Sequence, residues 1–495
     1  MSANADGVFI IYTGGTIGSL PKDERDPMSP LVPKKLEEVM KRLPNYDERD
    51  KKIFIGGKWI RIGTLCWEKP IDSSNISPKD WQDLATIIKQ NYNDWEGFIV
   101  LHGTDTMAYT SSVLAFMLDN LSKPVVITGS QKPIGETRSD AVQNLVTAIE
   151  IAAAKSLGCT VVPEVVVFFR DQLYRGCRTT KMSASDYNAF YSPNFTPLAE
   201  VGEHIVVNES AIRKPSLQTL NINTNLDENI ASLDIFPGMS TILLNNILTT
   251  ENLKGVVLKT FGTGNAPTTP EFLKVIEEAV SSGKVIVDVT QCRAGEVELG
   301  LYDVSAGLLS RGVTSGLDMT PEAALTKMAV ILGKKSSNEI AADLMQLNLK
   351  GEQRQSIFNI HLPGGAIGDD GKPVKVGQIG TMIEGHLYES DKLDKAIFRL
   401  MGVELIEGKR GIIDFRAYID LPGADDNTSE EGNPNFLGKW SKKYDRDEGP
   451  VSIFQDIKKQ ALNFIDPRHP ITITIVSIGA PIKWSKINIA LFVNS

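Results

Sequence analysis

The sequence predicts an α/β protein with two doubly wound-like α/β domains, a larger N-terminal one and a smaller one after it, followed by a β-rich C-terminal extension. Short apolar runs alternate with helical periodicity over residues 8–169 and again over 256–332, which is typical of parallel sheets with crossover helices. Beyond about residue 349, apolar residues instead recur at every second position, as in half-buried strands. The predicted parts are residues 1–213, a linker at 214–237, residues 238–352, and an extension at 353–495.

The first domain is predicted from four short apolar runs separated by helical patterns. The expected strands are residues 8–12, 97–101, 124–128 and 165–169, and the expected helices follow Ser77 and cover 108–119 and 139–154. Ser77 reads as an N-cap because Pro78 follows it at the first helical position. Trp81, Leu84 and Ile88 then form the buried stripe of that helix.

The second domain and the extension are predicted in the same way. Asn, Pro and Ser accumulate between residues 210 and 238, which favours a linker there. Strands are expected at 256–260 and 285–290, helices at 269–281 and 321–332, and alternating strands at 412–419 and 471–476. The charged, glycine-bearing stretch at 421–449 is predicted to be a long surface loop.

The composition restricts the classes of partner. The chain has 61 Asp and Glu residues against 52 Lys and Arg, a formal net charge of −9. A nucleic-acid-binding or anionic-membrane-binding protein usually shows a basic balance, so neither class of partner is expected. A small polar substrate or a protein partner fits this composition better.

The cysteines and the N-terminus favour the cytoplasm. Cys66, Cys159, Cys177 and Cys292 are far apart in a long chain, and we expect free thiols rather than two disulfides. Residues 1–7 lack the apolar core of a secretory signal, and no apolar run approaches the ~18 residues of a membrane span.

Two threonine-centred glycine motifs are the strongest functional signal. Thr13-Gly14-Gly15-Thr16-Ile17-Gly18 follows the first predicted strand, and His102-Gly103-Thr104-Asp105-Thr106-Met107 follows the second. The carboxyl edge of a parallel sheet is where ligands bind, so each motif places a hydroxyl at such an edge. Either motif alone could be an ordinary capped turn. Neither fits the phosphate-binding P-loop or the dinucleotide-binding fingerprint.

The remaining residues favour a hydroxyl nucleophile that works without histidine or metal. His102 ends a buried strand and is expected to be structural, and the other four histidines show no metal-ligand spacing. A threonine hydroxyl is weakly nucleophilic and needs a base, for which a desolvated lysine is one route. Lys181, in Arg178-Thr179-Thr180-Lys181, follows the fourth strand and could supply it, although a surface lysine is the simpler interpretation of this residue alone.

Together the motifs resemble those of the bacterial-type L-asparaginases, most closely their type I cytoplasmic branch. The second motif is highly specific, and the resemblance covers roughly residues 8–350. Further matching stretches are Asp72-Ser-Ser-Asn75, Thr128-Gly-Ser-Gln131, Tyr174-Arg-Gly-Cys-Arg-Thr-Thr-Lys181, Gly262-Thr-Gly-Asn-Ala-Pro267 and Thr290-Gln-Cys292.

The resemblance implies hydrolysis of L-asparagine to aspartate and ammonia through an acyl-enzyme, with no metal and no cofactor. It makes Thr16 the nucleophile, and Thr104, Asp105 and Lys181 a second catalytic set. Asp105 would also bind the substrate's α-ammonium group, and Ser73 and Ser74 would lie at its carboxylate end. Backbone N–H groups of the Gly103–Thr104 turn are our candidates for stabilising the oxyanion.

The resemblance also implies a homodimer or homotetramer, in which Asn265 would reach a neighbouring subunit's site. Thr180, Lys259 and Cys292 match an allosteric asparagine site of type I relatives. Lysine stands at 259 where relatives have arginine, and it cannot form arginine's bidentate fork. The lid over residues 19–35 contains no tyrosine, which many relatives use to activate the nucleophile.

Alternatives remain open at this point. The chain could be an amidohydrolase subunit that supplies ammonia to a tRNA-dependent amidotransferase, although such relatives carry their extra domain before the first motif. It could also be an inactive amino-acid-binding relative. The extension could bind an unknown partner, regulate substrate access, or support the oligomer.

Overall fold

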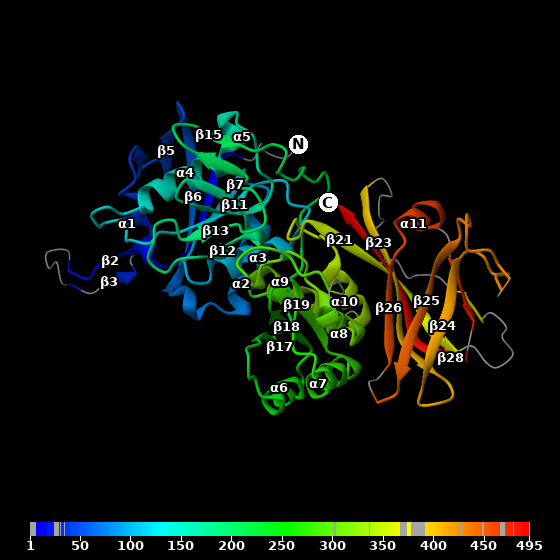
Figure 1. Ribbon diagram of the computed structural model, residues 1–495. Coiled ribbons are helices and arrows are strands. Elements are labelled where there is room, and N and C mark those ends of the chain that lie inside the picture. Colours follow the sequence, from blue (N-terminus) through cyan, green and yellow to red (C-terminus); the bar gives the residue numbers. More distant parts are fainter. Residues whose placement is uncertain are drawn as a thin grey trace.

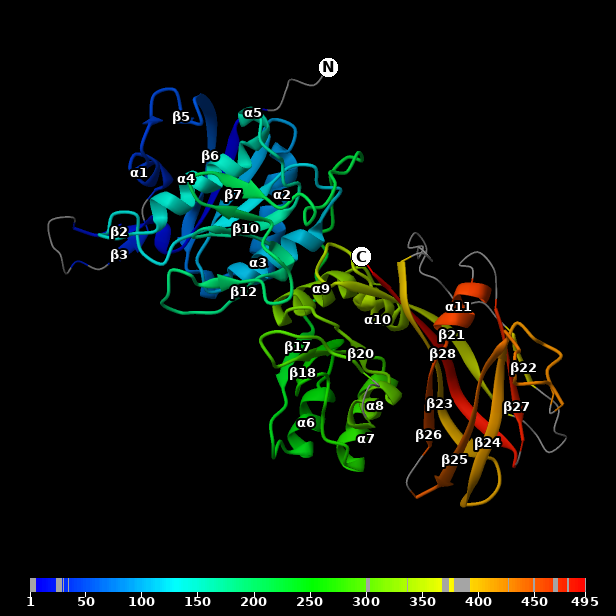
Figure 2. The same ribbon diagram turned by 45° about the horizontal axis from the view of Figure 1, so that its top comes forward.

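The computed structural model describes residues 6–23, 29, 31–33, 35–299, 303–335, 337–366, 374–377, 392–425, 427–447, 450–465, 471–478 and 480–494. It has three parts that follow one another along the chain, as Figures 1 and 2 both show. The second α/β domain lies between the first α/β domain and the C-terminal β-sandwich. The predicted fold class, two α/β domains followed by a β-rich extension, is confirmed.

The first domain is built on a ten-stranded mixed sheet in the order β15-β14-β11-β10-β9-β7-β1-β6-β5-β4. Its central strands β10, β9, β7, β1 and β6 are parallel. The strands of this sheet are β1 (Val8–Gly14), β4 (Tyr46–Asp47), β5 (Lys52–Ile55), β6 (Lys58–Ile71), β7 (Gly97–Leu101), β9 (Val125–Thr128), β10 (Val165–Phe169), β11 (Gln172–Arg175), β14 (Ala199–Val201) and β15 (Ile205–Val207).

Helices cover both faces of this sheet. In β1, Val8, Ile10 and Tyr12 pack with α1 and α4, whereas Phe9 and Ile11 pack with α2 and α3. Because each central strand is buried on both faces, it reads in the sequence as a continuous apolar run. The helices are α1 (Leu36–Met40), α2 (Pro78–Asn91), α3 (Met107–Met117), α4 (Ala141–Ala152) and α5 (Ala154–Leu157). The short pairs are β2 (Ser19–Pro21) with β3 (Leu31–Pro33), β8 (Leu118–Asp119) with β16 (Asn221–Ile222), and β12 (Thr180–Lys181) with β13 (Phe190–Tyr191).

The second domain has a four-stranded parallel sheet in the order β17-β18-β19-β20. Helices α6, α7 and α8 cover one face, and α9 and α10 cover the other. The strands are β17 (Ile230–Asp234), β18 (Gly255–Thr260), β19 (Val285–Thr290) and β20 (Thr314–Ser315), and the helices are α6 (Thr241–Leu248), α7 (Pro270–Ser281), α8 (Asp303–Ser310), α9 (Pro321–Gly333) and α10 (Asn338–Gln346).

One strand of this sheet lies where we expected a linker. β17 falls inside residues 214–237 and pairs along its whole length with β18. Only part of each of its side chains is buried, because β17 is the edge strand of the sheet. Such a strand lacks the continuous apolar run that identified β18 and β19.

The extension is a β-sandwich of two antiparallel four-stranded sheets, β21-β28-β23-β26 and β22-β27-β24-β25. Buried side chains from both sheets form one core that includes Phe398, Phe415 and Trp440. The elements are β21 (Gln355–Ala366), β22 (Val374–Gly377), β23 (Leu393–Leu405), β24 (Arg410–Ile419), β25 (Phe436–Asp445), β26 (Val451–Asp456), α11 (Lys458–Phe464), β27 (Thr472–Ser477) and β28 (Ile482–Asn494).

The prediction of a surface loop over 421–449 was wrong for its second half. β25 occupies Phe436–Asp445 and pairs with β24. The strand shows no strict apolar alternation in the sequence: its buried residues are Leu437, Trp440, Tyr444 and Asp445, and three exposed lysines stand between them. An edge strand that carries charges is a common protection against pairing with other chains.

Candidate active site

The first motif forms a sharp turn at the carboxyl end of β1. Gly15 has φ +86°, a left-handed value that favours glycine, and its N–H donates to the carbonyl of Ile71 at 3.2 Å. The half-buried Thr16 begins a short 3-10 helix, η1 (Thr16–Gly18). The Thr13 hydroxyl donates to the carbonyl of Leu101 at 3.0 Å, so it joins β1 to β7 instead of facing a ligand.

The second motif lies directly against the first. A Cβ atom on Gly15 would come within 2.5 Å of the backbone nitrogen of Gly103. A Cβ atom on Gly103 would come within 2.5 Å of Ser73 Oγ. The glycines therefore allow three backbone segments to meet, and they bring Thr16, Thr104 and Ser73 to one edge of the sheet.

Lys181 completes a hydrogen-bonded group around Thr104. Its Nζ donates to Thr104 Oγ1 at 2.9 Å and forms an ion pair with Asp105 Oδ1 at 2.6 Å. The Lys181 side chain is only 17% exposed, whereas that of Asp105 is 62% exposed. An ammonium group held against a buried hydroxyl can stabilise negative charge on that oxygen and exchange a proton with it.

Gln131 was not among the predicted site residues. The Thr104 hydroxyl donates to Gln131 Oε1 at 3.4 Å, and Gln131 Nε2 donates to the carbonyl of Asp186. The sequence did contain a signal for this residue, because Gln131 follows a predicted strand. That strand, β9, is the neighbour of β7 in the sheet, and side chains that follow adjacent parallel strands lie at the same edge.

A third segment of the site follows β6 and consists of Asp72, Ser73 and Ser74. The Asp72 carboxylate accepts hydrogen bonds from the Ser74 N–H and hydroxyl, both at 2.9 Å, and caps η2 (Ser73–Asn75). These bonds lower the pKa of Asp72. Ser73 is buried, Ser74 is exposed, and the Thr106 hydroxyl donates to the Ser73 carbonyl at 2.7 Å. Thr106 thus joins this segment to the second motif.

His102 has a structural place, as expected. Its Nδ1–H donates to the carbonyl of Gly103 at 2.6 Å, and its Nε2 accepts from the Thr110 hydroxyl at 2.9 Å. Burial lowers the pKa of His102 to about 4, so the ring is neutral at neutral pH. Both ring nitrogens are occupied in holding the second motif onto α3.

Tyr12 is the tyrosine closest to the first motif, and it is not a base. Its Oη lies against Gly18 and has no hydrogen-bond partner among the described residues. Burial raises the pKa of Tyr12, which keeps the phenol protonated. Tyr12 therefore cannot replace a lid tyrosine by accepting the Thr16 proton.

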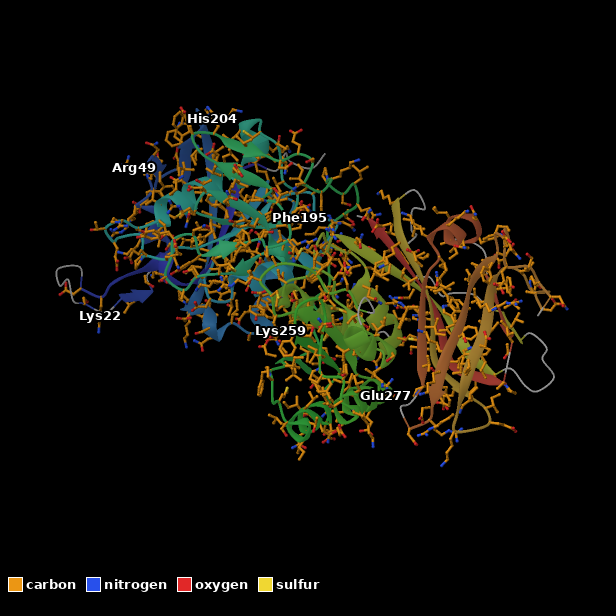
Figure 3. All side chains as sticks on the ribbon, in the orientation of Figure 1. Lys22, Arg49, Phe195, His204, Lys259 and Glu277 are labelled. Atoms are coloured by element: carbon orange, nitrogen blue, oxygen red, sulfur yellow. The ribbon has the colours of Figure 1, made fainter. Side chains whose placement is uncertain are left out.

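Two of the candidate allosteric residues, Thr180 and Lys259, lie where the two α/β domains meet. Figure 3 shows Lys259 on the side of the second domain that faces the first, and its Nζ pairs with Asp234 at 2.7 Å. Thr180 precedes Lys181 in β12, but its hydroxyl donates to Glu322 Oε1 at 2.6 Å. Burial raises the pKa of Glu322, and the nearby Lys259 partly opposes this shift. Glu322, in the first turn of α9, was missed because it lies 142 residues from Thr180.

Cys292 and Asn265 both lie in turns of the second domain. The exposed Cys292 follows β19, and its N–H donates to Thr290 Oγ1 at 3.0 Å. Asn265 lies in the turn after β18, and its Oδ1 is buried without a partner among the described residues. An unpaired buried amide oxygen of this kind is uncommon and is available to a further donor.

The described residues contain no group of three or more His, Cys, Asp or Glu side chains placed to hold a metal ion. No helix in the described part of the chain is long and apolar enough to cross a membrane. All four cysteines are free thiols.

Comparisons with known proteins agree with this geometry. Residues 7–213 match the family model "Asparaginase, N-terminal", and residues 229–345 match "Glutaminase/Asparaginase C-terminal domain". L-asparaginase 1 of Escherichia coli (strain K12) is 38% identical over 345 residues, which is 70% of this chain and 97% of that protein. The 60 kDa lysophospholipase of Homo sapiens is 37% identical over 361 residues, covering 70% of this chain and 61% of that one.

A solved structure gives the same result. L-asparaginase I from Vibrio cholerae superposes with a TM-score of 0.62 at 36% identity, covering 70% of this chain and 99% of that chain. Both matched family ranges end before the β-sandwich begins. Over its two α/β domains, the chain belongs to the asparaginase family.

Proposed function

We propose that this chain is an L-asparaginase, which hydrolyses the side-chain amide of L-asparagine to L-aspartate and ammonia. The observation that carries the proposal is the contact between the two glycine motifs, with Lys181 bonded to both Thr104 and Asp105. Family membership and the names of the relatives support the same activity.

In the proposed mechanism, Thr16 is the nucleophile. Its hydroxyl oxygen bonds to the amide carbon, and N–H groups of the Gly103–Thr104 turn stabilise the resulting oxyanion. The carbon–nitrogen bond then breaks. Ammonia leaves with the proton that the Thr16 hydroxyl gave up, and an ester to Thr16 remains. Water attacks that ester, releases aspartate and restores the threonine hydroxyl. Lys181 and Thr104 form the group suited to exchange a proton during these steps.

Substrate binding is proposed to use charge at both ends of the amino acid. The half-exposed carboxylate of Asp105 suits the α-ammonium group, and the hydroxyls of Ser73 and Ser74 suit the α-carboxylate. Because Lys181 already compensates Asp105 on one side, the carboxylate is held in a fixed orientation.

Assembly and regulation are proposed on narrower grounds. A homodimer or homotetramer would let Asn265, with its unpaired Oδ1, contact a neighbouring active site. An allosteric asparagine site at Thr180, Lys259 and Cys292 would have to displace the existing pairs with Glu322 and Asp234. A cytoplasmic location is supported by the four free thiols.

The test is ammonia release by the full chain from L-asparagine and, separately, from L-glutamine. We expect turnover of asparagine, and its loss in Thr16→Ala. Thr86→Ala is the matched control, because Thr86 lies on α2 and its hydroxyl bonds only to the helix backbone at Gln82. A folded wild-type chain that releases no ammonia at millimolar asparagine would exclude the proposed activity. Sigmoidal dependence on asparagine would support the allosteric site.

A further inference from the structure

The outer face of one sandwich sheet packs against the second α/β domain. In β23, Phe398 and Leu400 lie in the sandwich core. Since strand side chains alternate between faces, Arg399 between them points toward the second domain. Asn488 in β28 lies between two core residues in the same way and shares this face. Figure 2 shows the sheet that contains β23 and β28 on the side of the sandwich nearest α8 and α10.

Arg399 is a buried cation with no carboxylate partner among the residues that the structure describes. Its side chain is 7% exposed, and one hydrogen bond, from Nη1 to Asn488 Oδ1 at 3.3 Å, holds it. Its Nε has no hydrogen-bond partner among the described residues. Burial lowers the pKa of Arg399 to about 10, with no opposing contribution from a carboxylate. A buried charge normally persists only when it is paired.

The other buried arginines follow that rule. Arg175 Nε contacts Glu164 at 2.6 Å, and Arg178 Nη1 contacts Asp318 at 2.7 Å. Both carboxylates are themselves almost completely buried. Arg399 therefore differs from two equally buried guanidinium groups of the same chain by lacking the anion that each of them has.

Two cavities reach Arg399 from the junction between the domains. One of about 280 Å³ is also lined by Asp343, His361, Asn488 and Lys486. The other, of about 370 Å³, is also lined by Arg354 and by four carboxylate residues, Glu296, Glu298, Asp394 and Asp456. These volumes suit a small metabolite more than a large cofactor.

Both carboxylates that line the smaller cavity are already engaged, and Glu339 pairs with Lys486 at 3.5 Å. Asp343 accepts hydrogen bonds from His361 Nε2 at 3.0 Å and from Asn359 Nδ2 at 3.0 Å. Asn488 Nδ2 in turn donates to Asn359 Oδ1 and to His361 Nδ1. Donors on β21 thus satisfy the carboxylate of Asp343, which lies on α10. The positive charge of Arg399, which lines the same cavity, is not compensated by any carboxylate of the described residues.

We propose that Arg399 anchors a binding site for a small carboxylate at the junction of the sandwich and the second α/β domain. The planar guanidinium, with a free Nε beside Nη groups, matches the two oxygens of a carboxylate. Two carboxylates, Glu339 and Asp343, and two lysines, Lys284 and Lys486, line the same cavity, so its surroundings balance in charge and favour a singly charged anion over a dianion such as phosphate. The site lies outside the catalytic edge of the first domain and uses residues of the extension.

His361 provides a local measurement of binding. The chain has five histidines, and His361 lines the cavity and bonds to the Asn488 that holds Arg399. The full-length protein, labelled at histidine Cε1, is titrated with acetate, propionate, phosphate or sulfate, and the NMR signals are followed. We expect a monocarboxylate to shift the His361 signal saturably and to leave the His102 signal, near the active site, unchanged.

Two variants assign the effect to Arg399. Arg399→Gln keeps a hydrogen-bond donor but removes the charge, and we expect its affinity for the carboxylate to fall at least about tenfold. Arg410→Gln removes the same charge from the other sheet of the sandwich, at a side chain that is 71% exposed and pairs with Asp445, and it should bind like the wild type. The proposal is overturned if no monocarboxylate shifts His361 saturably in the wild type, or if Arg399→Gln binds equally well. Saturable binding of phosphate or sulfate alone would overturn the assignment to a carboxylate.

Discussion

Replacing Lys181 by methionine removes the Nζ that contacts Thr104 at 2.9 Å and Asp105 at 2.6 Å, while it keeps a side chain of similar length. If Lys181 moves protons in the reaction, kcat for asparagine should fall about 10²- to 10⁴-fold. At about 1.36 kcal/mol per tenfold, that is a loss of roughly 2.7–5.5 kcal/mol of transition-state stabilisation. The free energy of unfolding should fall by less than about 1 kcal/mol, because Asp105 is 62% exposed and its ion pair is well solvated.

The assay combines ammonia release over a range of asparagine concentrations with urea denaturation of the same preparations. Lys132→Met is the matched control: Lys132 neighbours Gln131, is 44% exposed, and pairs only loosely with Glu136 at 3.6 Å. It should retain wild-type kcat. A Lys181→Met protein that keeps more than about a tenth of wild-type kcat would refute the reasoning, and so would a loss explained by unfolding.

The remaining predictions concern the glycine contact and a buried carboxyl. Gly15→Ala should abolish asparagine hydrolysis and destabilise the fold, because the new Cβ would meet Gly103. Gly57→Ala is the control: Gly57 also has a positive φ but open space around it, so the variant should lose about 1–2 kcal/mol of unfolding free energy and stay active. Equal effects of the two substitutions in denaturation and ammonia assays would contradict this. Burial raises the pKa of Asp288 from about 4 to about 8, so the folded chain keeps a proton that the unfolded chain releases. The stability of the wild type should therefore decrease as the pH rises from about 4 to about 8. Asp288→Asn should not show this decrease, and it keeps an oxygen acceptor for the Thr260 hydroxyl. Parallel pH profiles of Tm for the two proteins would disprove the prediction.

Much of the α/β fold could be predicted from sequence because burial on both faces leaves a strong local signal. β10 and β19 were predicted at the bounds they have, and α2 begins at Pro78 as expected. There the Asp80 carboxylate accepts from both the N–H and the hydroxyl of Ser77, which is a local interaction. β17 and β25 were missed because edge strands bury only part of their side chains.

The candidate active site was partly predictable for a related reason. The motifs follow β1 and β7, and parallel strands that are adjacent in a sheet expose their carboxyl ends at one edge. Which side chains touch there could not be read from the sequence. Gln131, Thr106 and Glu322 find their partners 27 to 142 residues away, and such pairings depend on the register and on domain packing.

The sequence by itself determined the central strands of the α/β domains and several of their helices, the two glycine turns and the hydroxyls that they present, because these features depend on local burial and backbone conformation. The tertiary structure alone decided that Gly15 and Gly103 touch, that Lys181 reaches Thr104, and that Arg399 has no carboxylate partner in the described part of the chain. Each of these depends on which distant segments pack together. A buried charge has consequences only once its neighbours are known, since the same arginine is stable beside a carboxylate and costly without one.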